Sequence, residues 1–258
     1  MQSNAEEFLI KVDRVSKTFE SDNRKVKAIK EVSVGINEGD FITIVGPSGC
    51  GKSTLLKMIA GYFSPTSGNI YLNGETIKGP GRERAVVFQE DAVFPWMNVE
   101  DNLAYGLKRR NVSASKIEET VDHYLELVGL LDCKGLYPKE LSGGMKKRVD
   151  IARAYANDPE VLLMDEPFGS LDVLTKSEMQ DELLGILRAE SKTVIFVTHD
   201  LEEAIFLSDK VVFLTEGPST IDEILKVPFE RPREQHLKTT PKFQQFRENA
   251  SEELGILT

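Results

Sequence analysis

The nine residues GPSGCGKST at positions 46–54 constrain the fold of this chain more than any other feature. They fit the pattern G-x-x-x-x-G-K-[S/T]. A continuously apolar, β-branched run (FITIV, 41–45) precedes them, and a helical pattern (KSTLLKMIAG, 52–61) overlaps and follows them. A loop of this kind between a buried strand and a helix aims backbone amides and the positive end of the helix dipole at phosphate groups. The sequence therefore predicts a strand–loop–helix unit that binds a polyphosphate.

The residue types within this loop suit a nucleoside triphosphate with its magnesium ion. Glycines let the backbone wrap closely around phosphates. The Lys52 ammonium can reach the β- and γ-phosphates, and the Ser53 hydroxyl can ligate Mg²⁺. The predicted nucleotide-binding residues of the loop are Gly46, Pro47, Ser48, Gly49, Cys50, Gly51, Lys52, Ser53 and Thr54.

A second apolar run, VLLMDE at 161–166, ends in two adjacent carboxylates. Ligands of open α/β sheets bind at the carboxyl ends of the strands. Asp165 is thereby placed to hold Mg²⁺ through water, and Glu166 to orient or deprotonate an attacking water. An acidic pair is by itself a common way to end a strand. The phosphate-binding loop about 110 residues upstream favours the catalytic interpretation.

His199 lies in VTHD, directly after the apolar run TVIFV at 193–197. A lone histidine is more often structural than catalytic. Its position at the end of a strand, on the same predicted sheet edge as the phosphate-binding loop, favours a contact with the γ-phosphate.

Buried strands alternate with helical patterns along most of the chain. An amphipathic pattern at 175–190, for example, lies between two of the apolar runs. This alternation is typical of an α/β fold with a mainly parallel sheet. The predicted buried strands are 41–45, 85–88, 161–165, 193–197 and 210–214.

The N-terminal part follows a different pattern. Residues 8–19 and 25–36 alternate apolar and polar side chains around the polar stretch DNR at 22–24. Such alternation predicts half-exposed strands joined by a turn. We therefore expect an antiparallel β region ahead of the parallel core.

Residues 90–155 carry no signal for a buried strand and predict a helical insertion. Within it, Ser115 is the expected N-cap of a helix, and earlier in the chain Gly61 is the expected end of the helix that begins at Lys52. We expect a single domain over 1–258. Its parts would be a nucleotide-binding core with the β region (1–89 and 156–220), a helical subdomain (90–155) and a C-terminal tail (221–258).

The tail mixes charges and prolines, so loops and short helices are expected there. Phe243, Phe246 and Leu254 could form an apolar stripe, on a terminal helix that docks on its own domain. Only about 40 residues follow the last predicted strand. That length leaves no room for an additional C-terminal regulatory domain.

Charge and composition exclude several classes of protein. With 42 acidic against 32 basic residues, the formal net charge is -10. A chain this acidic is a poor candidate for a nucleic-acid binder, which would need a basic face. Its two cysteines, Cys50 and Cys133, cannot build a disulfide framework. Because neither a signal-peptide pattern nor an apolar run of about 20 residues is present, we expect a cytosolic chain whose membrane connection runs through a partner.

Seven elements in order resemble the ATPase subunit of an ABC transporter, and the resemblance covers nearly the whole chain. They are Phe19 ahead of the loop, GPSGCGKST, Gln89 in VVFQE, LSGGM at 141–145, VLLMDEP, SLD at 170–172 and VTHD. The resemblance implies that ATP and Mg²⁺ are the ligands. It also implies that Phe19 stacks on adenine, that Gln89 senses Mg²⁺ and the attacking water, and that Asp172 helps to couple two subunits.

In this family two copies pair head to tail, and each ATP lies between the phosphate-binding loop of one copy and the signature of the other. The resemblance therefore implies that Ser142, Gly143 and Gly144 bind a phosphate held by the second copy. Met145 departs from the commoner glutamine. It removes one polar side chain but leaves the serine hydroxyl and the glycine amides.

The segment 91–107 resembles that of importers of the nitrate, sulfonate, taurine and bicarbonate group, as do MDEPFGSLD and RPR at 231–233. In such a complex the helical subdomain contacts a multi-span membrane subunit, which an extracytoplasmic solute-binding protein serves. Two interpretations of Phe94-Pro95-Trp96 remain open. It is either a core aromatic cluster or a wall of the groove for a membrane-subunit helix.

The resulting expectation is an ATP-hydrolysing importer subunit for a small anionic solute, held at the cytoplasmic face of the membrane by its partner. Three alternatives share part of this evidence. They are an exporter or lipid-trafficking ATPase, a non-transport ABC ATPase, and a nucleotide-binding regulator that does not hydrolyse. The intact set Lys52, Gln89, Asp165, Glu166 and His199 argues against the last of these.

Overall fold

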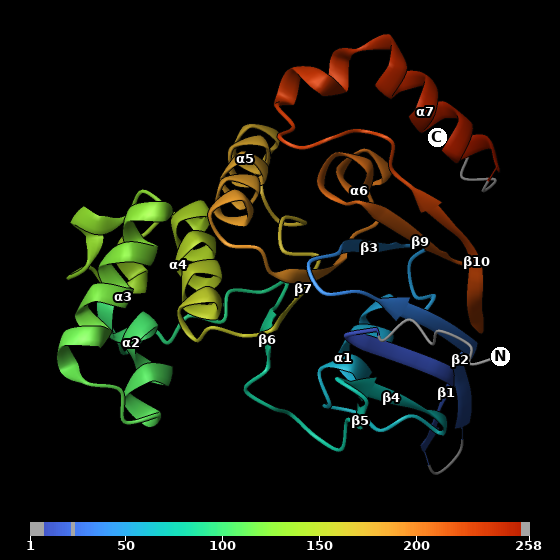
Figure 1. Ribbon diagram of the computed structural model, residues 1–258, viewed down its shortest axis with the longest axis horizontal. Coiled ribbons are helices and arrows are strands. Elements are labelled where there is room, and N and C mark those ends of the chain that lie inside the picture. Colours follow the sequence, from blue (N-terminus) through green and yellow to red (C-terminus); the bar gives the residue numbers. More distant parts are fainter. Residues whose placement is uncertain (1–7, 22–23, 254–258) are drawn as a thin grey trace, which may run out of the picture. The chain divides into compact units, whose positions relative to one another are not determined.

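The computed structural model describes residues 8–21 and 24–253 and divides them into two compact units (Figure 1). The first unit runs to Gly81 and continues through Lys192–Arg231 and from His236 onward. The second unit consists of Arg82–Ser191 and Pro232–Gln235. The two units are described separately below.

The first unit is built on a mixed sheet whose N-terminal part is antiparallel, as predicted. Strand β1 (Ile10–Ser21) pairs with β2 (Arg24–Ile36), with Ile10 opposite Ile36, and on its other side with β4 (Ser67–Leu72). The short strand β5 (Glu75–Thr76) completes this edge. The predicted turn at 22–24 falls partly on residues 22–23, which lie outside the described residues.

The same sheet continues into parallel strands that carry the core of this unit. β3 (Phe41–Val45) lies between β8 (Thr193–Val197) and β9 (Lys210–Leu214) and is parallel to both. All five residues of β3 and of β8 are buried, which explains their unbroken apolar runs. These three strands confirm the predicted ranges.

Helix α1 (Lys52–Ile59) follows β3 and ends where the sequence indicated. Gly61, two residues past the helix, has a φ of 85°. A Cβ atom there would lie 2.2 Å from the Gly79 carbonyl oxygen. Both the left-handed backbone and this close approach require glycine.

The C-terminal part of the first unit differs from the prediction. Residues 219–226 form a strand, β10 (Ser219–Lys226), which pairs antiparallel with β9 and parallel with β2. This strand was not predicted, because its mixed polar and apolar residues have no buried-strand pattern. Helix α6 (Leu201–Leu207), a 3₁₀ turn (Gln235–Thr239) and helix α7 (Pro241–Glu253) complete the chain.

The predicted apolar stripe of the tail is present in part. Phe243 is fully buried, and its ring lies 5.4 Å from that of Phe229. Phe246 meets Phe229 edge to face at 5.6 Å. Leu254 lies outside the described residues.

The second unit contains two parallel strands and most of the helices. β6 (Arg84–Val87) pairs with β7 (Val161–Asp165), with Val87 opposite Met164. Helices α2 (Val99–Arg109), α3 (Ala114–Leu127) and α4 (Gly143–Ala156) pack against one another, and α5 (Val173–Ala189) packs on α3 and α4 (Figure 1). Short 3₁₀ turns occupy Leu131–Cys133 and Pro138–Glu140.

Side-chain caps set the starts of several helices in the second unit. Asn98 accepts a hydrogen bond from the Asp101 amide at the start of α2. The expected cap Ser115 is wrong, because α3 begins at Ala114 and its N-cap is Ser113. Ser113 has the extended backbone of a cap, whereas Ser115 already lies in the first turn of the helix.

Within the described ranges 8–21 and 24–253, no helix has the length and apolar character needed to cross a membrane.

Candidate functional site

In the first unit, the loop between β3 and α1 is closed by the side chain of Lys52. The Lys52 side chain is 5% exposed and curls back over the loop. Its Nζ donates to the carbonyl oxygens of Gly46 at 2.8 Å and of Pro47 at 3.0 Å. The ammonium group is thus held against the first two residues of the loop.

Two of the loop glycines are required by geometry. Gly51 has a φ of 109° immediately before the helix, a value that other residues rarely adopt. A Cβ atom at Gly46 would lie 2.7 Å from the Leu214 carbonyl oxygen. The side chain of Cys50 is buried beneath the loop, and this burial raises the pKa of its thiol. The cysteine therefore has a packing role in the loop.

His199 lies at the same sheet edge as this loop. It follows β8, and the neighbouring strand β3 leads into the loop, with Ile44 opposite Val197. The amide of Thr198 donates to the Ile44 carbonyl at 3.3 Å, so the residue before the histidine is tied to the strand that enters the loop. His199 itself is exposed. The structure thus brings His199 to the edge where the sequence analysis expected it.

Phe19 lies on β1 of the first unit and is 37% exposed. Its ring meets the Phe63 ring edge to face at 5.6 Å, and the Lys17 ammonium lies 5.1 Å from its centroid. These contacts hold the ring in place while a large part of it stays accessible. An exposed, fixed aromatic ring of this kind suits stacking on a planar base.

In the second unit, the carboxyl ends of β6 and β7 gather three of the predicted residues. Asp165 ends β7 and is 7% exposed, and Glu166 follows it. Gln89 comes two residues after β6, the parallel neighbour of β7. A Cβ atom at Gly169 would lie 3.5 Å from the side-chain nitrogen Nε2 of Gln89 and 3.6 Å from Glu166 Oε2. The side chains of Gln89 and Glu166 therefore both lie close to the backbone of Gly169.

The backbone of Glu166 is strained. Its φ of 44° lies in the left-handed region, which costs a residue with a side chain about 1 kcal/mol or more. A turn from the Gly169 amide to the Glu166 carbonyl, 3.1 Å long, holds this conformation. Strain of this kind clusters at functional sites and is consistent with a carboxylate that is aimed for a task.

The signature stretch and Asp172 come together at the starts of two helices. Ser142 is the N-cap of α4, and its Oγ accepts from the Met145 amide at 3.2 Å. Asp172 is the N-cap of α5, and the hydroxyl of Thr175 donates to it at 2.6 Å, which lowers the pKa of its carboxyl. A Cβ atom at Gly144 would lie 2.8 Å from Thr175 Cγ2, so the two caps are neighbours.

Gly143, by contrast, has open space around its Cα atom, since a Cβ atom there would meet no atom within 4 Å. Met145 contributes its backbone amide to the cap, which any residue other than proline could do. The departure from glutamine at this position therefore leaves the helix start intact.

The predicted magnesium ligands suit a metal that arrives with its nucleotide. Among the described residues, no group of three or more His, Cys, Asp or Glu side chains could hold a metal ion by itself. Mg²⁺ prefers hard oxygen ligands and commonly takes one or two carboxylates together with substrate phosphates. The carboxylate of Asp165 and the hydroxyl of Ser53 are oxygen donors of this class, so the residues fit the ion.

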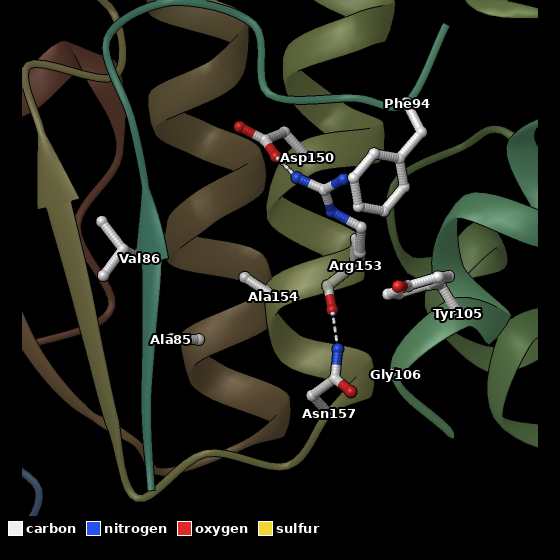
Figure 2. A pocket seen from close by; sticks show the side chains of 9 residues that line it. All are labelled: Ala85, Val86, Phe94, Tyr105, Gly106, Asp150, Arg153, Ala154 and Asn157. Atoms are coloured by element: carbon white, nitrogen blue, oxygen red, sulfur yellow. Dashed lines mark hydrogen bonds and ion pairs between the residues drawn. The ribbon is translucent and has the colours of Figure 1, made fainter. Parts of the chain in front are cut away.

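A pocket of about 190 Å³ lies between β6, α2 and α4 in the second unit (Figure 2). Phe94 and Tyr105 form one side, with ring centroids 5.0 Å apart. Trp96, which is 70% exposed, stacks on Phe94 at 5.5 Å. The predicted aromatic cluster is thus partly a packed group and partly an exposed surface. Its contact with a membrane-subunit helix stays a prediction.

Asn102 on α2 fixes the turn that carries these aromatic residues. Its fully buried side chain accepts from the Phe94 amide at 2.7 Å and donates to the carbonyls of Met97 and Asn98 at 3.1 and 2.9 Å. Phe94 and Trp96 are therefore presented from a rigid turn rather than from a mobile loop.

Three charged residues of α4 were not predicted as part of the site, namely the buried Lys147 and Asp150 and the partly buried Arg153. The side chains of Lys147 and Asp150 are each 1% exposed, although both are charged. The sequence contains a pattern that indicates this burial. The charged residues recur every three positions, on a side of α4 that also carries the apolar residues Val149, Ile151 and Ala154.

A family model described as "ABC transporter" matches residues 29–169. The Nitrate import ATP-binding protein NrtD of Synechococcus elongatus is 48% identical over 92% of this chain and 88% of its own length. The Aliphatic sulfonates import ATP-binding protein SsuB of Bacillus cereus is 42% identical over 92% of both chains.

Among solved structures, the dimeric, post-hydrolysis state of the ATP-binding cassette MJ0796 bound to ADP and Pi has a TM-score of 0.73 to this chain. It is 28% identical, and the match covers 86% of this chain and all of that one.

Proposed function

This chain belongs to the ABC transporter family, and we propose that it is the ATP-hydrolysing subunit of an importer for a small anionic solute. The observation that carries the proposal is the likeness, over 92% of the chain, to proteins named for nitrate import and for aliphatic sulfonate import. The candidate solutes are therefore nitrate, sulfonates, taurine, bicarbonate and ions like them.

The first unit supplies the residues that we assign to binding ATP. Phe19 would stack on adenine, the loop from Gly46 to Thr54 would surround the phosphates, and Lys52 would neutralise the β- and γ-phosphate oxygens. In support, Lys52 is already held over the loop by two carbonyl oxygens. His199, at the same sheet edge, is assigned to the γ-phosphate.

The second unit supplies the residues that we assign to the attacking water. Glu166 is the general base, and Gln89 orients the water and senses the metal. Both side chains lie around Gly169, which supports a joint role. We assign Mg²⁺ to Ser53, Gln89 and Asp165. Its chemistry is to offset negative charge on the phosphate oxygens.

The signature residues Ser142, Gly143 and Gly144 are assigned to an ATP bound by a second copy of the chain. The exposed start of α4 supports this, because its serine cap and its glycines leave the helix end open to an anion. Asp172, beside it, is assigned to coupling between the copies. ATP then stabilises a closed head-to-tail dimer, since the ligand binds the closed state better than the open one.

A mixture of two defective chains tests this head-to-tail arrangement. One chain carries Lys52→Met, and the other carries Gly143→Glu, which places a carboxylate in open space at the signature. Each alone should be inactive in the reconstituted transporter. An equimolar mixture should recover about a quarter of wild-type ATPase activity, because half of the dimers are mixed and each holds one intact site.

Gly135→Glu is the matched control for that mixture, since Gly135 also has open space around it. It should leave the rate unchanged. If the mixture stays as inactive as its components, both motifs serve the same chain's site and the head-to-tail assignment is wrong.

The membrane subunit is assigned to the helical subdomain, which we place at 90–155, with the nucleotide-binding core at 1–89 and 156–220 and the tail at 221–258. The pocket beside Phe94 and the exposed Trp96 support this choice, because aromatic residues on a rigid turn are typical interface anchors. An extracytoplasmic solute-binding protein would act through the membrane subunit. The chain would then lie at the cytoplasmic face of the membrane.

Trp96→Ala tests the docking assignment. We expect it to lower the amount of membrane subunit that co-purifies with the chain by about fivefold or more, while ATP affinity stays within about twofold. Tyr137→Ala is the control, since this tyrosine is also an exposed aromatic (43%) of the second unit. Equal recovery for both variants would contradict the assignment.

The proposed function as a whole is tested by reconstituting the chain with its membrane and binding subunits in vesicles. ATP hydrolysis should rise with nitrate, a sulfonate, taurine or bicarbonate, and cationic solutes should have no effect. An exporter or lipid-trafficking ATPase would instead couple hydrolysis to efflux, and a non-transport ATPase would not assemble with a membrane subunit.

A further inference from the structure

The segment from Phe88 to Phe94, which contains Gln89, is attached to helix α4 at its first end by a buried lysine. The Lys147 side chain is 1% exposed. Its Nζ donates to the carbonyl oxygens of Phe88 at 2.9 Å and of Gln89 at 3.1 Å. A buried ammonium bonded to two successive carbonyls fixes the backbone from which the Gln89 side chain projects.

The far end of the same segment is attached to α4 by an arginine. The Arg153 guanidinium lies 4.8 Å from the centroid of the Phe94 ring, a cation–π contact on one side of the pocket (Figure 2). Its Nη2 donates to Asp150 Oδ1 at 2.6 Å. The ring that would meet the membrane subunit therefore rests directly on a charged side chain of α4.

Asp150 lies between the two cations, one helical turn from each, on the same side of α4. Burial raises the pKa of its carboxyl and lowers the pKa of the Lys147 ammonium, while their mutual attraction opposes both shifts. Asp91 Oδ1 lies 4.0 Å from Lys147 Nζ, so two cations face two anions. We name Lys147, Asp150 and Arg153 the charge triad of α4.

Removing the charge triad from water costs free energy. Buried charges lose hydration, and apolar residues of similar volume often stabilise a fold at least as well. Within the described part of the chain, Asp150 Oδ2 and Arg153 Nη1 also lack hydrogen-bond partners although they are buried. A role in positioning explains this arrangement better than a role in stability.

We infer that the charge triad fastens the 88–94 segment to α4, so that the Phe94 end, the Gln89 end and the Ser142 start of the helix move as one body. A displacement of Phe94 is transmitted to α4 through Arg153. It is then transmitted from α4 to the backbone of Gln89 through Lys147. Lys147 and Arg153 are thus positioning residues that act through Gln89 and through the signature. The functional consequence rests on the proposed function, in which Phe94 meets the membrane subunit and Gln89 senses the nucleotide.

The fastening is tested by amide hydrogen exchange on the full-length, nucleotide-free chain. Lys147→Met removes both hydrogen bonds and should make exchange across 88–94 about fivefold faster or more. Lys147→Gln keeps N–H donors without the charge and should restore part of the protection. The control is Lys146→Met, the same change at the neighbouring, half-buried lysine, which should leave exchange in this segment unchanged.

The transmission is tested at the opposite end. Arg153→Met should also speed exchange at Gln89, and the double variant with Lys147→Met should be less than additive, because both contacts hold one body. Exchange at Gln89 that does not respond to Arg153→Met, or strict additivity, would overturn the inference. Should Lys147→Met fail to fold, Lys147→Gln against Lys146→Met decides the same question.

In the reconstituted transporter, Lys147→Met should lower kcat about tenfold with the KM for ATP within about twofold, since Gln89 acts on turnover. A raised KM with normal kcat would assign Lys147 to nucleotide binding and overturn the positioning role. The exchange measurements need no ATP. If the wild-type complex does not hydrolyse ATP, the proposed function is wrong, while exchange still decides whether the segment is fastened.

Discussion

Replacing Glu166 with glutamine should reduce ATP turnover by about 10²- to 10⁴-fold while leaving ATP binding intact. Glutamine has the shape of glutamate and can adopt the same strained backbone, but it cannot accept the proton of the attacking water. Since ATP is bound and not consumed, Glu166→Gln should also accumulate as an ATP-bound dimer. Steady-state hydrolysis, equilibrium ATP binding and size-exclusion chromatography with ATP and Mg²⁺ measure the three effects.

Glu160→Gln is the matched control for this variant. Glu160 is an exposed glutamate just before β7, at the end of the strand opposite to Glu166. The same chemical change there should leave turnover within about twofold, as is usual for exposed sites away from special features. Normal hydrolysis by Glu166→Gln would show that another group activates the water.

Lys52→Met should weaken ATP binding by about 10- to 100-fold, because a hydrogen bond between charged groups contributes about 1.5–3 kcal/mol. Methionine has similar length and no charge, so it leaves the phosphate oxygens without their counter-charge. It also removes the donor that now satisfies the carbonyls of Gly46 and Pro47. Isothermal titration with ATP measures the affinity, and thermal melting separates this loss from a loss of fold.

Lys57→Met is the control, since Lys57 lies in the last turn of the same helix α1. It should bind ATP as the wild type does. If Lys52→Met also binds ATP normally, the loop between β3 and α1 is not the site of the triphosphate, and the assignment of the first unit fails.

Local patterns were sufficient to predict the parallel core. The runs 41–45, 161–165 and 193–197 are apolar because both faces of these strands are covered, and the structure places each of the three strands at the predicted residues. The phosphate-binding loop follows from one of them, because its spacing and its flanking elements are encoded in a single short stretch.

Other features depend on contacts between distant residues and leave no local signal. Strand β10 is stabilised by its pairing with β9 and β2. Apolar and polar residues alternate too weakly in its own sequence to predict a strand. Ser113 and Ser115 are the same residue type two positions apart, so local sequence does not distinguish which of them is the helix cap. The same limit applies to the left-handed backbone of Glu166, which a turn to Gly169 imposes.

The residue types of the candidate site could be predicted from the sequence, but the contacts that hold these residues in position could not. The position of Lys52 follows from the motif of the loop, and those of Asp165 and Glu166 follow from chemistry at the end of a strand. Lys147 shows what such reasoning misses, because its partners are the backbone carbonyls of Phe88 and Gln89, and a carbonyl has the same chemistry in every residue.

Trp96 is the single tryptophan of the chain, and it is 70% exposed on the turn beside the pocket. The intrinsic fluorescence of the protein excited in the indole band therefore comes from one ring at one place. Its emission should shift when a partner covers this turn, with no dye attached and no background from other indoles. Because Trp96 belongs to the second unit, its emission also follows the unfolding of that unit without a contribution from any other indole.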